Sequence, residues 1–377
     1  MENDPAPSLI ECLGEIEDPR IARTRRHKLV DVLAVGLCSS LTVGETFNDM
    51  ELFGKIREDW LRTFLELPNG IPSHDTFNRV FSAIDPRSFL DCFVRWVRGV
   101  CPALGNDVVA IDGKAVRRAA GEGETIPHIV SAWAAHNRLA LGQVQVGGKS
   151  NEITAVPELL DVLHLKGCIV TLDAMGCQKE IAARIAGKKA DYVLALKKNH
   201  PTVFEEVQLF FADAAAPCAD MADGPKGMAF HKTVDKDHGR LETRRYWLST
   251  NTAWFQDKKL WKDLRAFGMV ESVRRVKGKA SIERRFYLTS LDGDVETFAD
   301  AVRAHWGVEN PLHWCLDVIF REDYSRARTK NAAQNLAALR RIALNLIKKN
   351  PRPKVSQRQK RIFAALDAAF LEELLGI

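Results

Sequence analysis

The sequence predicts an α/β fold in which a mixed sheet follows a small all-helical region and is interrupted by a β-rich stretch. Apolar residues recur at helical spacing up to about residue 100. Beyond residue 107, short and mostly apolar strand-like runs alternate with helical patterns. Between about 205 and 290 the pattern changes to charged hairpins. The length of 377 residues is enough for two or three domains.

The N-terminal region reads as a series of amphipathic helices. Helical spacing covers residues 27–43, 44–67, 73–84 and 85–100, and the second of these ranges is either one helix or a pair. The cluster "PNGIPS" at 68–73 marks a turn, and Ser73 is a good N-cap for the helix that follows. A Pro/Gly break at 101–107 ends the pattern, so we expect an all-α domain over residues 1–103.

The next segment has the element order β-β-β-α-β-α-β. Strands are expected at 107–113, 128–135 and 139–147, a helix at 154–165, a strand at 169–174, a helix at 178–189 and a strand at 191–197. The second and third strands flank a short "HNR" turn and should pair as a hairpin. Helices between short apolar strands favour a mixed sheet that is covered on both faces.

The C-terminal half begins with hairpins and ends with helices. Two β-hairpins are expected at 228–250 and 266–291, and helices at 294–320 and 330–350. "PRP" at 351–353 then breaks the chain before a last amphipathic helix at 357–375. We therefore expect one domain over 104–350, with a β-rich insertion at about 205–290, and a helical tail at 351–377.

The net charge of +5 is small, but it is unevenly distributed. Residues 321–361 contain 13 Lys and Arg against 2 Asp and Glu, a local net charge of +11. Such an excess indicates either a polyanionic partner or a solvated basic helix face. The eight cysteines include no C-x-x-C pair, which is typical of reduced thiols in a cytoplasm. Neither a signal peptide nor a membrane-spanning apolar run is present, so we expect a cytoplasmic protein without a membrane partner.

Two aspartates occupy matching places in this pattern. Asp112 ends the strand in "VVAIDG", and Asp173 ends the strand in "IVTLDA". The element order resembles the ribonuclease H-like architecture, in which these two strands are neighbours. Two carboxylates at adjacent strand ends repel each other, and a hard cation such as Mg²⁺ removes that cost. The alternative is that each aspartate is only a surface cap or turn residue.

A third acidic ligand is expected, and Glu309 in "AHWGVENPLHW" is the candidate. Two Mg²⁺ ions about 4 Å apart can stabilise both the attacking and the leaving oxygen of a phosphoryl transfer. A zinc site of His305, Glu309 and His313 is the alternative on this segment. Pro311 disfavours a helical conformation at Asn310, and the spacing is not H-E-x-x-H, so zinc is disfavoured.

Seven motifs, in order, resemble the landmarks of one family. They are "GIPSHDTFNRVF", "AIDGKAVRR", "KSNEITAVPELL", "TLDAMGCQKEIA", "DYVLALKKNHP", "HGRLETR" and "HWGVENPLHWCLDVIFRED". The resemblance as a whole covers roughly residues 10–350. The sequence resembles the insertion-sequence DDE transposases, of the ISAs-type branch related to the H-repeat-associated proteins. The resemblance implies a ribonuclease H-like core with Asp112, Asp173 and Glu309 as a catalytic triad that binds Mg²⁺ or Mn²⁺, as two ions. It also implies a β-rich insertion before the third acid.

The sequence departs from the signature of the wider superfamily, which places a Tyr, an Arg and a Lys around the glutamate. The corresponding positions here are Val302, His305 and Leu316, so the DNA-holding role of that Arg and Lys cannot be carried over. His305 is a candidate replacement for the Arg as a phosphate donor.

Other candidate DNA contacts are cations and polar residues near the expected strand ends, in the insertion and in the basic segment. With His305 they are Lys114, Lys149, Asn151, Lys197, Lys198, Arg240, Arg244, Arg326 and Arg328. Several have ordinary alternatives: Lys114 as an ion-paired surface lysine, Asn151 as a helix cap, and Arg244 paired with Glu242. Glu152 is a candidate supporting carboxylate near the metal ligands.

The expected function is therefore DNA transposition. The resemblance implies that water cleaves a phosphodiester at the element end and that the freed 3′-hydroxyl then attacks target DNA. Its partner is double-stranded DNA, both element ends and target, and pairing two ends implies at least a homodimer. In the cell it would be nucleoid-associated when bound to DNA. The alternatives are a metal-dependent nuclease of the same fold and a catalytically idle DNA-binding protein.

Overall fold

The computed structural model describes residues 7–101, 104–120, 125–147, 152–215, 228–237, 240–276, 279–352 and 354–377. The chain forms two units. Unit 1 contains Met1–Ala103, Gly113–Leu163 and Val308–Ile377, and unit 2 contains Leu104–Asp112 and His164–Gly307. The boundary between them passes through strand β1 (Val108–Ala115), which contributes residues to both.

The N-terminal part of unit 1 is helical, as predicted. It contains α1 (Leu9–Gly14), the short 3₁₀ turn η1 (Ala22–Thr24), α2 (Leu29–Leu41), α3 (Phe47–Ile56), α4 (Glu58–Leu61), α5 (His74–Ala83) and α6 (Pro86–Val100). The range 44–67 forms a pair of helices. The Ser73 hydroxyl accepts a hydrogen bond from the Thr76 N–H and so caps α5, which confirms that prediction. Asp85 caps α6 in the same way, ahead of a proline at the first helical position.

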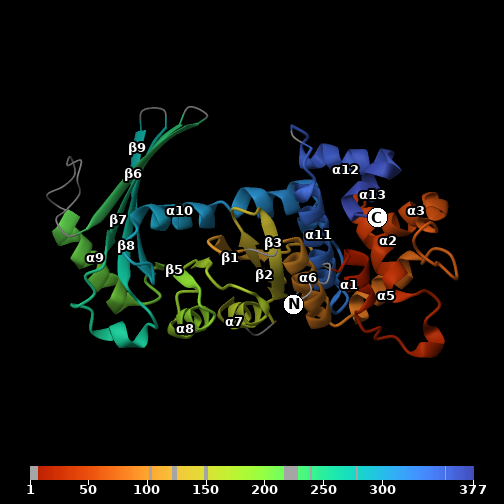
Figure 1. Cartoon of the computed structure of the whole chain (residues 1–377), viewed down its shortest axis with the longest axis horizontal. Helices are drawn as coiled ribbons and strands as arrows, with labels where there is room; N and C mark the ends of the chain where they lie inside the picture. The colour runs from red at the N-terminus through yellow and green to blue at the C-terminus, as the bar shows by residue number, and fades with distance from the viewer. Residues whose placement is uncertain are drawn as a thin grey trace, which may run out of the picture. The chain divides into compact units, whose positions relative to one another are not determined.

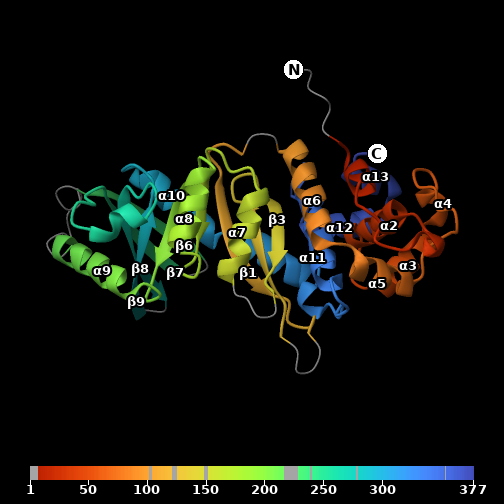
Figure 2. The ribbon, with the colours of Figure 1, turned by 90° about the horizontal axis from the view of Figure 1, so that it is seen from below.

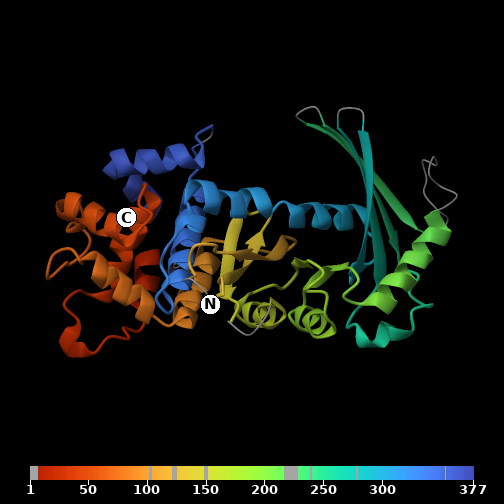
Figure 3. The same cartoon turned by 180° about the vertical axis from the view of Figure 1, so that it is seen from behind.

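The core of unit 1 forms around α11 (Ala332–Lys349), which packs against α2, α5, α6 and strand β3 (Figure 3). Two buried asparagines fix its position. The Asn335 amide donates to Phe81 O and Ile84 O at 2.8 and 3.0 Å. Asn345 pairs with both the N–H and the C=O of Ala140, each at 2.8 Å. These bonds satisfy backbone groups that would otherwise be buried without partners.

The predicted hairpin and the first covering helix also belong to unit 1. Strands β2 (His128–Ala134) and β3 (Leu139–Gln145) pair antiparallel, and α7 (Glu152–Val162) packs on both. At Gly142 in β3 a Cβ atom would lie 3.1 Å from the Leu90 side chain of α6. Glycine therefore allows α6 to approach the strand closely.

Two C-terminal helix predictions need correction. The range 294–320 is not one helix, because α10 (Val295–Trp306) is followed by the π-helix η3 (Glu309–Ile319) and the 3₁₀ turn η4 (Glu322–Tyr324). Pro311 lies in the first turn of η3, where its missing N–H would have no helical partner in any case. The last helix is two helices, α12 (Gln357–Leu366) and α13 (Ala368–Leu375). Asp367 between them is extended and caps α13 through the Ala369 N–H.

One mixed sheet contains all nine strands in the order β3-β2-β1-β4-β5-β9-β8-β7-β6, so the mixed α/β fold is confirmed. In unit 2, β1 pairs parallel with β4 (Ile169–Leu172), and β4 pairs parallel with β5 (Asp191–Leu196). The order β-β-β-α-β-α-β and the adjacency of the first and fourth strands match the prediction. Helix α8 (Lys179–Gly187) packs on β5 (Figure 2).

The remaining strands of unit 2 form two long hairpins, both predicted. They are β6 (Ala229–Asp237) with β7 (Arg240–Ser249), and β8 (Ala266–Val276) with β9 (Lys279–Thr289), linked by the 3₁₀ turn η2 (Gln256–Leu260). The stretch predicted as β-rich from about 205 also contains most of a helix, α9 (Pro201–Ala215). Its Phe204 and Phe211 pack on Phe286 of β9, and Figure 1 shows α9 and α10 on opposite faces of these strands.

The seven cysteines that lie in the described residues are free and buried, as expected for reduced thiols. No described helix is long and apolar enough to cross a membrane.

Candidate active site

The two predicted aspartates lie at the same end of two neighbouring strands in unit 2. Strands β1 and β4 run parallel with Ile111 opposite Leu172, and the next residues are Asp112 and Asp173. Neighbouring strands are about 4.8 Å apart, so the two carboxylates leave the sheet side by side. Both side chains are half-buried. One detail differs from the prediction: β1 does not end at Asp112 but continues to Ala115.

The loop after β4 fixes the orientation of Asp173. Its Oδ1 accepts hydrogen bonds from the N–H groups of Met175 and Gly176, at 3.0 and 3.3 Å. A Cβ on Gly176 would lie 2.6 Å from the Leu172 side chain, so a glycine is needed for this tight turn. The turn holds one carboxylate oxygen toward the backbone.

His305 of α10 lies beside this strand end. Its Nδ1 is 3.0 Å from the hydroxyl oxygen of Thr171, two residues before Asp173. Burial lowers the pKa of His305 to about 4, although the Asp173 carboxylate acts in the opposite direction. The imidazole is therefore neutral near pH 7. The next residue, Trp306, stacks under the guanidinium of Arg285, whose carbon is 4.1 Å from the ring centre.

Glu309 is the first residue of η3 in unit 1, and its side chain is exposed. π-Helical turns are rare and frequently occur at functional sites. Among the residues that the structure describes, no group of three or more His, Cys, Asp or Glu side chains is arranged to hold a metal ion. The chemistry of the donors nevertheless fits a hard cation, because Asp112 and Asp173 offer carboxylate oxygens at one sheet edge.

Lys114, predicted to contact DNA, lies instead in a carboxylate cluster of unit 1. Its side chain is only 8% exposed, and its Nζ lies 2.6 Å from Asp317, 2.9 Å from Asp323 and 3.4 Å from Glu322. Burial by itself lowers the pKa of Lys114, but the three carboxylates raise it above its usual value. A lysine neutralised by three acids has little charge to offer a phosphate, so the ion-paired alternative describes it better.

The cluster continues to a fully buried arginine. Arg341 of α11 and Glu322 are both 0% exposed and form an ion pair of 2.9 Å. The Arg341 guanidinium also donates to the Ser131 hydroxyl of β2 and to Ala337 O, each at 3.1 Å. Lys114 and Asp317 thereby connect β1 to η3, and Arg341 connects the same cluster to α11. We call Lys114, Asp317, Glu322, Asp323 and Arg341 the buried ion cluster.

The sequence did not identify this cluster as a structural unit. Arg341 was included only as one cation of the basic segment 321–361. Another contact that sequence alone could not show lies at Gly113, where a Cβ atom would be 2.1 Å from a carboxylate oxygen of Glu152. Glu152 is thus adjacent to the residue that follows Asp112.

The remaining predicted DNA contacts fall into three groups. Lys197 and Lys198 directly follow β5 and are exposed, at the same sheet edge as Asp173. Arg326 and Arg328 are also exposed, in unit 1 between η4 and α11, and Arg328 Nε donates to Arg118 O at 3.2 Å. Lys149, Asn151 and the side chain of Arg240 lie outside the described residues.

Arg244 forms the ion pair with Glu242 that the sequence offered as the alternative to DNA contact. It pairs with Glu242 at 2.7 Å and with Asp235 at 2.5 Å, and its side chain is 14% exposed. Segment 321–361, for which the sequence indicates a polyanionic partner or a solvated basic helix face, is not exposed throughout. Four of its cations are buried, because α11 and α12 pack into unit 1 on that side; they are Arg340, Arg341, Lys360 and Arg361.

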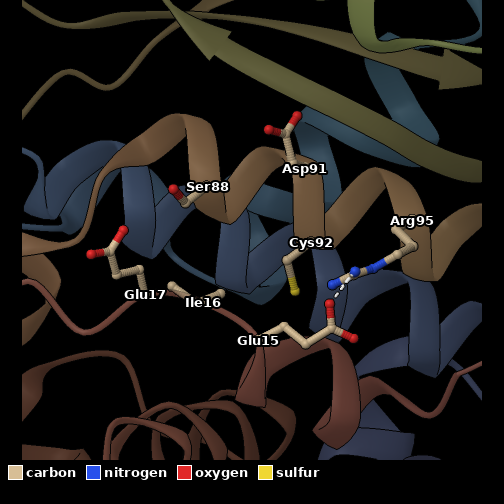
Figure 4. A pocket seen from close by; sticks show the side chains of 7 residues that line it. All are labelled: Glu15, Ile16, Glu17, Ser88, Asp91, Cys92 and Arg95. Atoms are coloured by element: carbon tan, nitrogen blue, oxygen red, sulfur yellow. Dashed lines mark hydrogen bonds and ion pairs between the residues drawn. The ribbon is translucent and has the colours of Figure 1, made fainter.

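A separate pocket of about 360 Å³ lies between residues 15–17, which follow α1, and helix α6 in unit 1. Its lining includes three acidic residues, and Glu15 and Arg95 form an ion pair across it (Figure 4). None of the predicted site residues lines this pocket, so it is not part of the candidate active site.

Comparison with known families identifies the family to which the chain belongs. Residues 103–346 match the "Transposase DDE domain" family, and residues 10–97 match the "DDE_Tnp_1-associated" family. The chain belongs to the DDE transposase family.

Full-length relatives are similar to this transposase-family chain. It is 38% identical over 375 residues to the "Putative transposase YncI" of Escherichia coli O157:H7, covering 98% of this chain and 94% of that protein. It is 36% identical over 375 residues to the "H repeat-associated putative transposase YhhI" of Escherichia coli strain K12, covering 98% and 97%. The resemblance to H-repeat-associated proteins is therefore confirmed.

One solved structure is more remotely similar. It is a cryo-EM structure of the piggyBac transposase synaptic complex with hairpin DNA, with a TM-score of 0.42 and 12% sequence identity. The alignment covers 98% of this chain and 78% of that one. A likeness at this level does not decide any feature of the site.

Proposed function

We propose that this member of the DDE transposase family is a DNA transposase with a ribonuclease H-like core. It catalyses metal-dependent cleavage at insertion-sequence ends and strand transfer into target DNA. The observation that carries the proposal is the pair Asp112 and Asp173, which follow the last paired residues of two adjacent parallel strands. Ligands in α/β proteins commonly bind outside the carboxyl ends of such strands.

Asp112, Asp173 and Glu309 are the residues that would hold the metal, as two Mg²⁺ or Mn²⁺ ions. Bound there, such ions supply charge neutralisation for a phosphoryl transfer and activate the attacking oxygen. The chain supplies the rest of the geometry. The Met175 and Gly176 N–H groups hold Asp173 in one orientation, which lowers the cost of ordering it when a ligand arrives.

The covalent chain supports Glu309 as the third acid. His305 contacts Thr171 in β4, and Glu309 follows His305 by four residues. Four residues span at most about 14 Å, so this short connection is compatible with the family pattern in which Glu309 is the third acid.

His305 replaces the arginine of the wider signature in this proposal. A neutral imidazole that accepts the Thr171 hydroxyl proton at Nδ1 carries its own proton at Nε2. That Nε2–H can donate one hydrogen bond to a phosphate oxygen. Lys197 and Lys198, and Arg326 and Arg328, would contact the DNA backbone, and two ends would be joined by a homodimer.

The proposal is tested by incubating the purified full chain with supercoiled DNA that carries both element ends, in Mg²⁺ or Mn²⁺. Wild type should cut at the ends and join them to target DNA. Asp112→Asn, Asp173→Asn and Glu309→Gln should each abolish cutting while the protein still binds the ends. Asp292→Asn is a matched control, because its side chain is 76% exposed and pairs only loosely with Arg265 at 3.7 Å.

Three other outcomes would change the conclusion. Binding without any cleavage by wild type would mean a catalytically idle DNA-binding protein. Cleavage of single ends without strand transfer would mean a nuclease. If Glu309→Gln still cuts while both aspartate variants do not, the third carboxylate is misassigned. Asp317 would be tested next, with the knowledge that it already pairs with Lys114.

A further inference from the structure

The four strands β6 to β9 form an antiparallel ribbon whose two faces differ. Residues opposite each other across the ribbon share a face, and the face alternates along each strand. The row His231, Tyr246, Val270 and Arg285 lies on one face, and the row Lys232, Arg245, Glu271 and Arg284 lies on the other. We call them the inner and the outer face of the ribbon.

The inner face packs against α10. Arg303 of α10 pairs with Asp235 at 3.3 Å, and the Phe298 ring meets those of Tyr246 and Tyr287 edge to face. A Cβ at Gly268 would lie 2.3 Å from the Phe298 ring, so the helix and the strand are in direct contact there. Arg244, which was predicted to bind DNA, lies on this inner face and is already paired.

Among the described helices, α9 packs on the outer face, at the end nearer β5. There, Phe204 and Phe211 of α9 pack on Phe286 of β9. Beyond α9 the ribbon continues, and no described helix covers it (Figures 1 and 3). The exposure pattern agrees: Lys232, Val234 and Lys236 are exposed, whereas the alternate residues of β6 are partly buried.

Three cross-strand rows make up this uncovered part of the outer face. The middle row contains Val234, Thr243, Val273 and Ile282, and Val234 and Ile282 are 58% and 66% exposed. The rows on either side contain Lys232, Arg245, Glu271 and Arg284, and Lys236, Leu241, Arg275 and Ala280. The three rows together have five cations and one carboxylate, a net charge of +4.

Two of the five cations are partly neutralised and three are not. Glu271 is nearly buried between Arg245 and Arg284, with both guanidinium contacts at 2.8 Å. This pairing fixes the positions of the two arginine side chains, and the row keeps a net positive charge. Lys232, Lys236 and Arg275 are exposed, and within the described part of the chain no ion pair engages them.

We infer that the uncovered outer face of the ribbon binds the phosphate backbone of duplex DNA. This inference rests on the proposed function and assigns a surface to it. Residues two apart along a strand are separated by about 6.7 Å, so the two basic rows are about 13 Å apart. The major groove is about 12 Å wide and admits β-ribbons. Each basic row can then meet one phosphate strand while the apolar row faces the groove between them.

A second copy of the chain is a poorer occupant of this face. A two-fold interface would place the same surface on both sides. Five cations and one carboxylate would then face an identical set, and like charges across an interface oppose association. A polyanion satisfies the charge of both rows, and the aliphatic row allows contact with thymine methyl groups.

The test measures binding of the full chain to duplex DNA that carries an element end, without divalent metal, at several salt concentrations. The variant is Lys232→Gln/Lys236→Gln/Arg275→Gln. Each lost phosphate contact reduces the slope of log K against log salt by about 1. The triple variant should therefore bind more weakly and have a slope shallower by about 3. Its Tm should match wild type, because the three side chains are exposed.

The matched control removes three exposed cations elsewhere in unit 2, as Lys258→Gln/Lys259→Gln/Lys262→Gln in and after η2. It loses the same net charge and should keep the wild-type slope. Equal slopes for both triple variants, or a wild-type slope for the ribbon variant, would overturn the inference. Failure of wild type to bind any duplex would instead overturn the proposed function. The two failures are therefore distinguishable.

Discussion

Replacing Arg341 with methionine should destabilise the protein strongly, because it leaves a carboxylate buried without its main partner. Arg341 and Glu322 are both 0% exposed, and their ion pair is 2.9 Å long. In Arg341→Met, Glu322 would retain Lys114, at 3.4 Å, and the charge of Arg340. Removing one member of a buried ion pair typically costs about 3–5 kcal/mol. Ser131 and Ala337 O would also lose a hydrogen-bond donor.

An exposed ion pair of the same kind serves as the control for this loss of stability. Arg352 and Glu373 lie 2.9 Å apart, but each side chain is 43% exposed. Exposed pairs contribute about 0–1 kcal/mol, so Arg352→Met should change the free energy of unfolding by no more than that. Both substitutions remove a guanidinium from an ion pair of 2.9 Å. Arg341 also loses its bonds to Ser131 and Ala337 O, whereas Arg352 loses its stacking on the Phe370 ring.

The assay is urea unfolding of the full chain, followed by both fluorescence and far-UV circular dichroism. Arg341→Met should lower the midpoint clearly, and Arg352→Met should leave it almost unchanged. Arg341→Met/Glu322→Met should recover much of the loss, because replacing a whole buried pair with apolar residues is often neutral. If Arg341→Met and Arg352→Met have the same midpoint, the buried ion cluster does not stabilise the fold as argued.

Three further outcomes follow from the same unit. Burial raises the pKa of Glu322, but Arg341 and Lys114 lower it to a net value below the usual range. Its stabilising effect is therefore present above pH about 4.3 and lost as pH falls through the folded pKa, and acid titration of Glu322→Gln should lack that loss. Burial lowers the pKa of Lys348 to about 8, near the ring of Trp133. Lys348→Met should therefore raise the midpoint of thermal unfolding at pH 7, with a gain that shrinks as pH rises above 8; a gain independent of pH would contradict the cause. Lys114→Met should speed hydrogen exchange of the amides of η3 more than those of α11, and equal acceleration of both would mean a global loss of stability only.

Local patterns in the sequence were sufficient to predict most of the helices and strands. Ser73 caps α5 as expected, because capping depends on residues within one helical turn. Strand-like runs ending at aspartates placed Asp112 and Asp173 at one sheet edge, since strand order follows from a short sequence of elements. The misses at η3 and at Asp367 are also local. In each, a helical pattern continued through a residue whose backbone takes another path.

The charged residues could not be interpreted from the sequence in the same way. The sequence does not distinguish a solvated basic residue from a buried or ion-paired one. The partner of a paired residue is often distant along the chain. Lys114 contacts Asp323 across 209 positions, and Arg341 contacts Ser131 across 210. Only the folded chain separates the neutralised cations, such as Lys114, Arg244 and Arg341, from the exposed ones.

The sequence by itself therefore determined the family, most of the order of helices and strands, and the aspartate pair that carries the proposed chemistry. These features depend on residue types over short stretches, where periodicity, caps and turns are encoded. The tertiary structure decided which charges are available to a ligand and which face of the β-ribbon is open. Burial and ion pairing are properties of side chains that meet only after folding, so no local pattern records them.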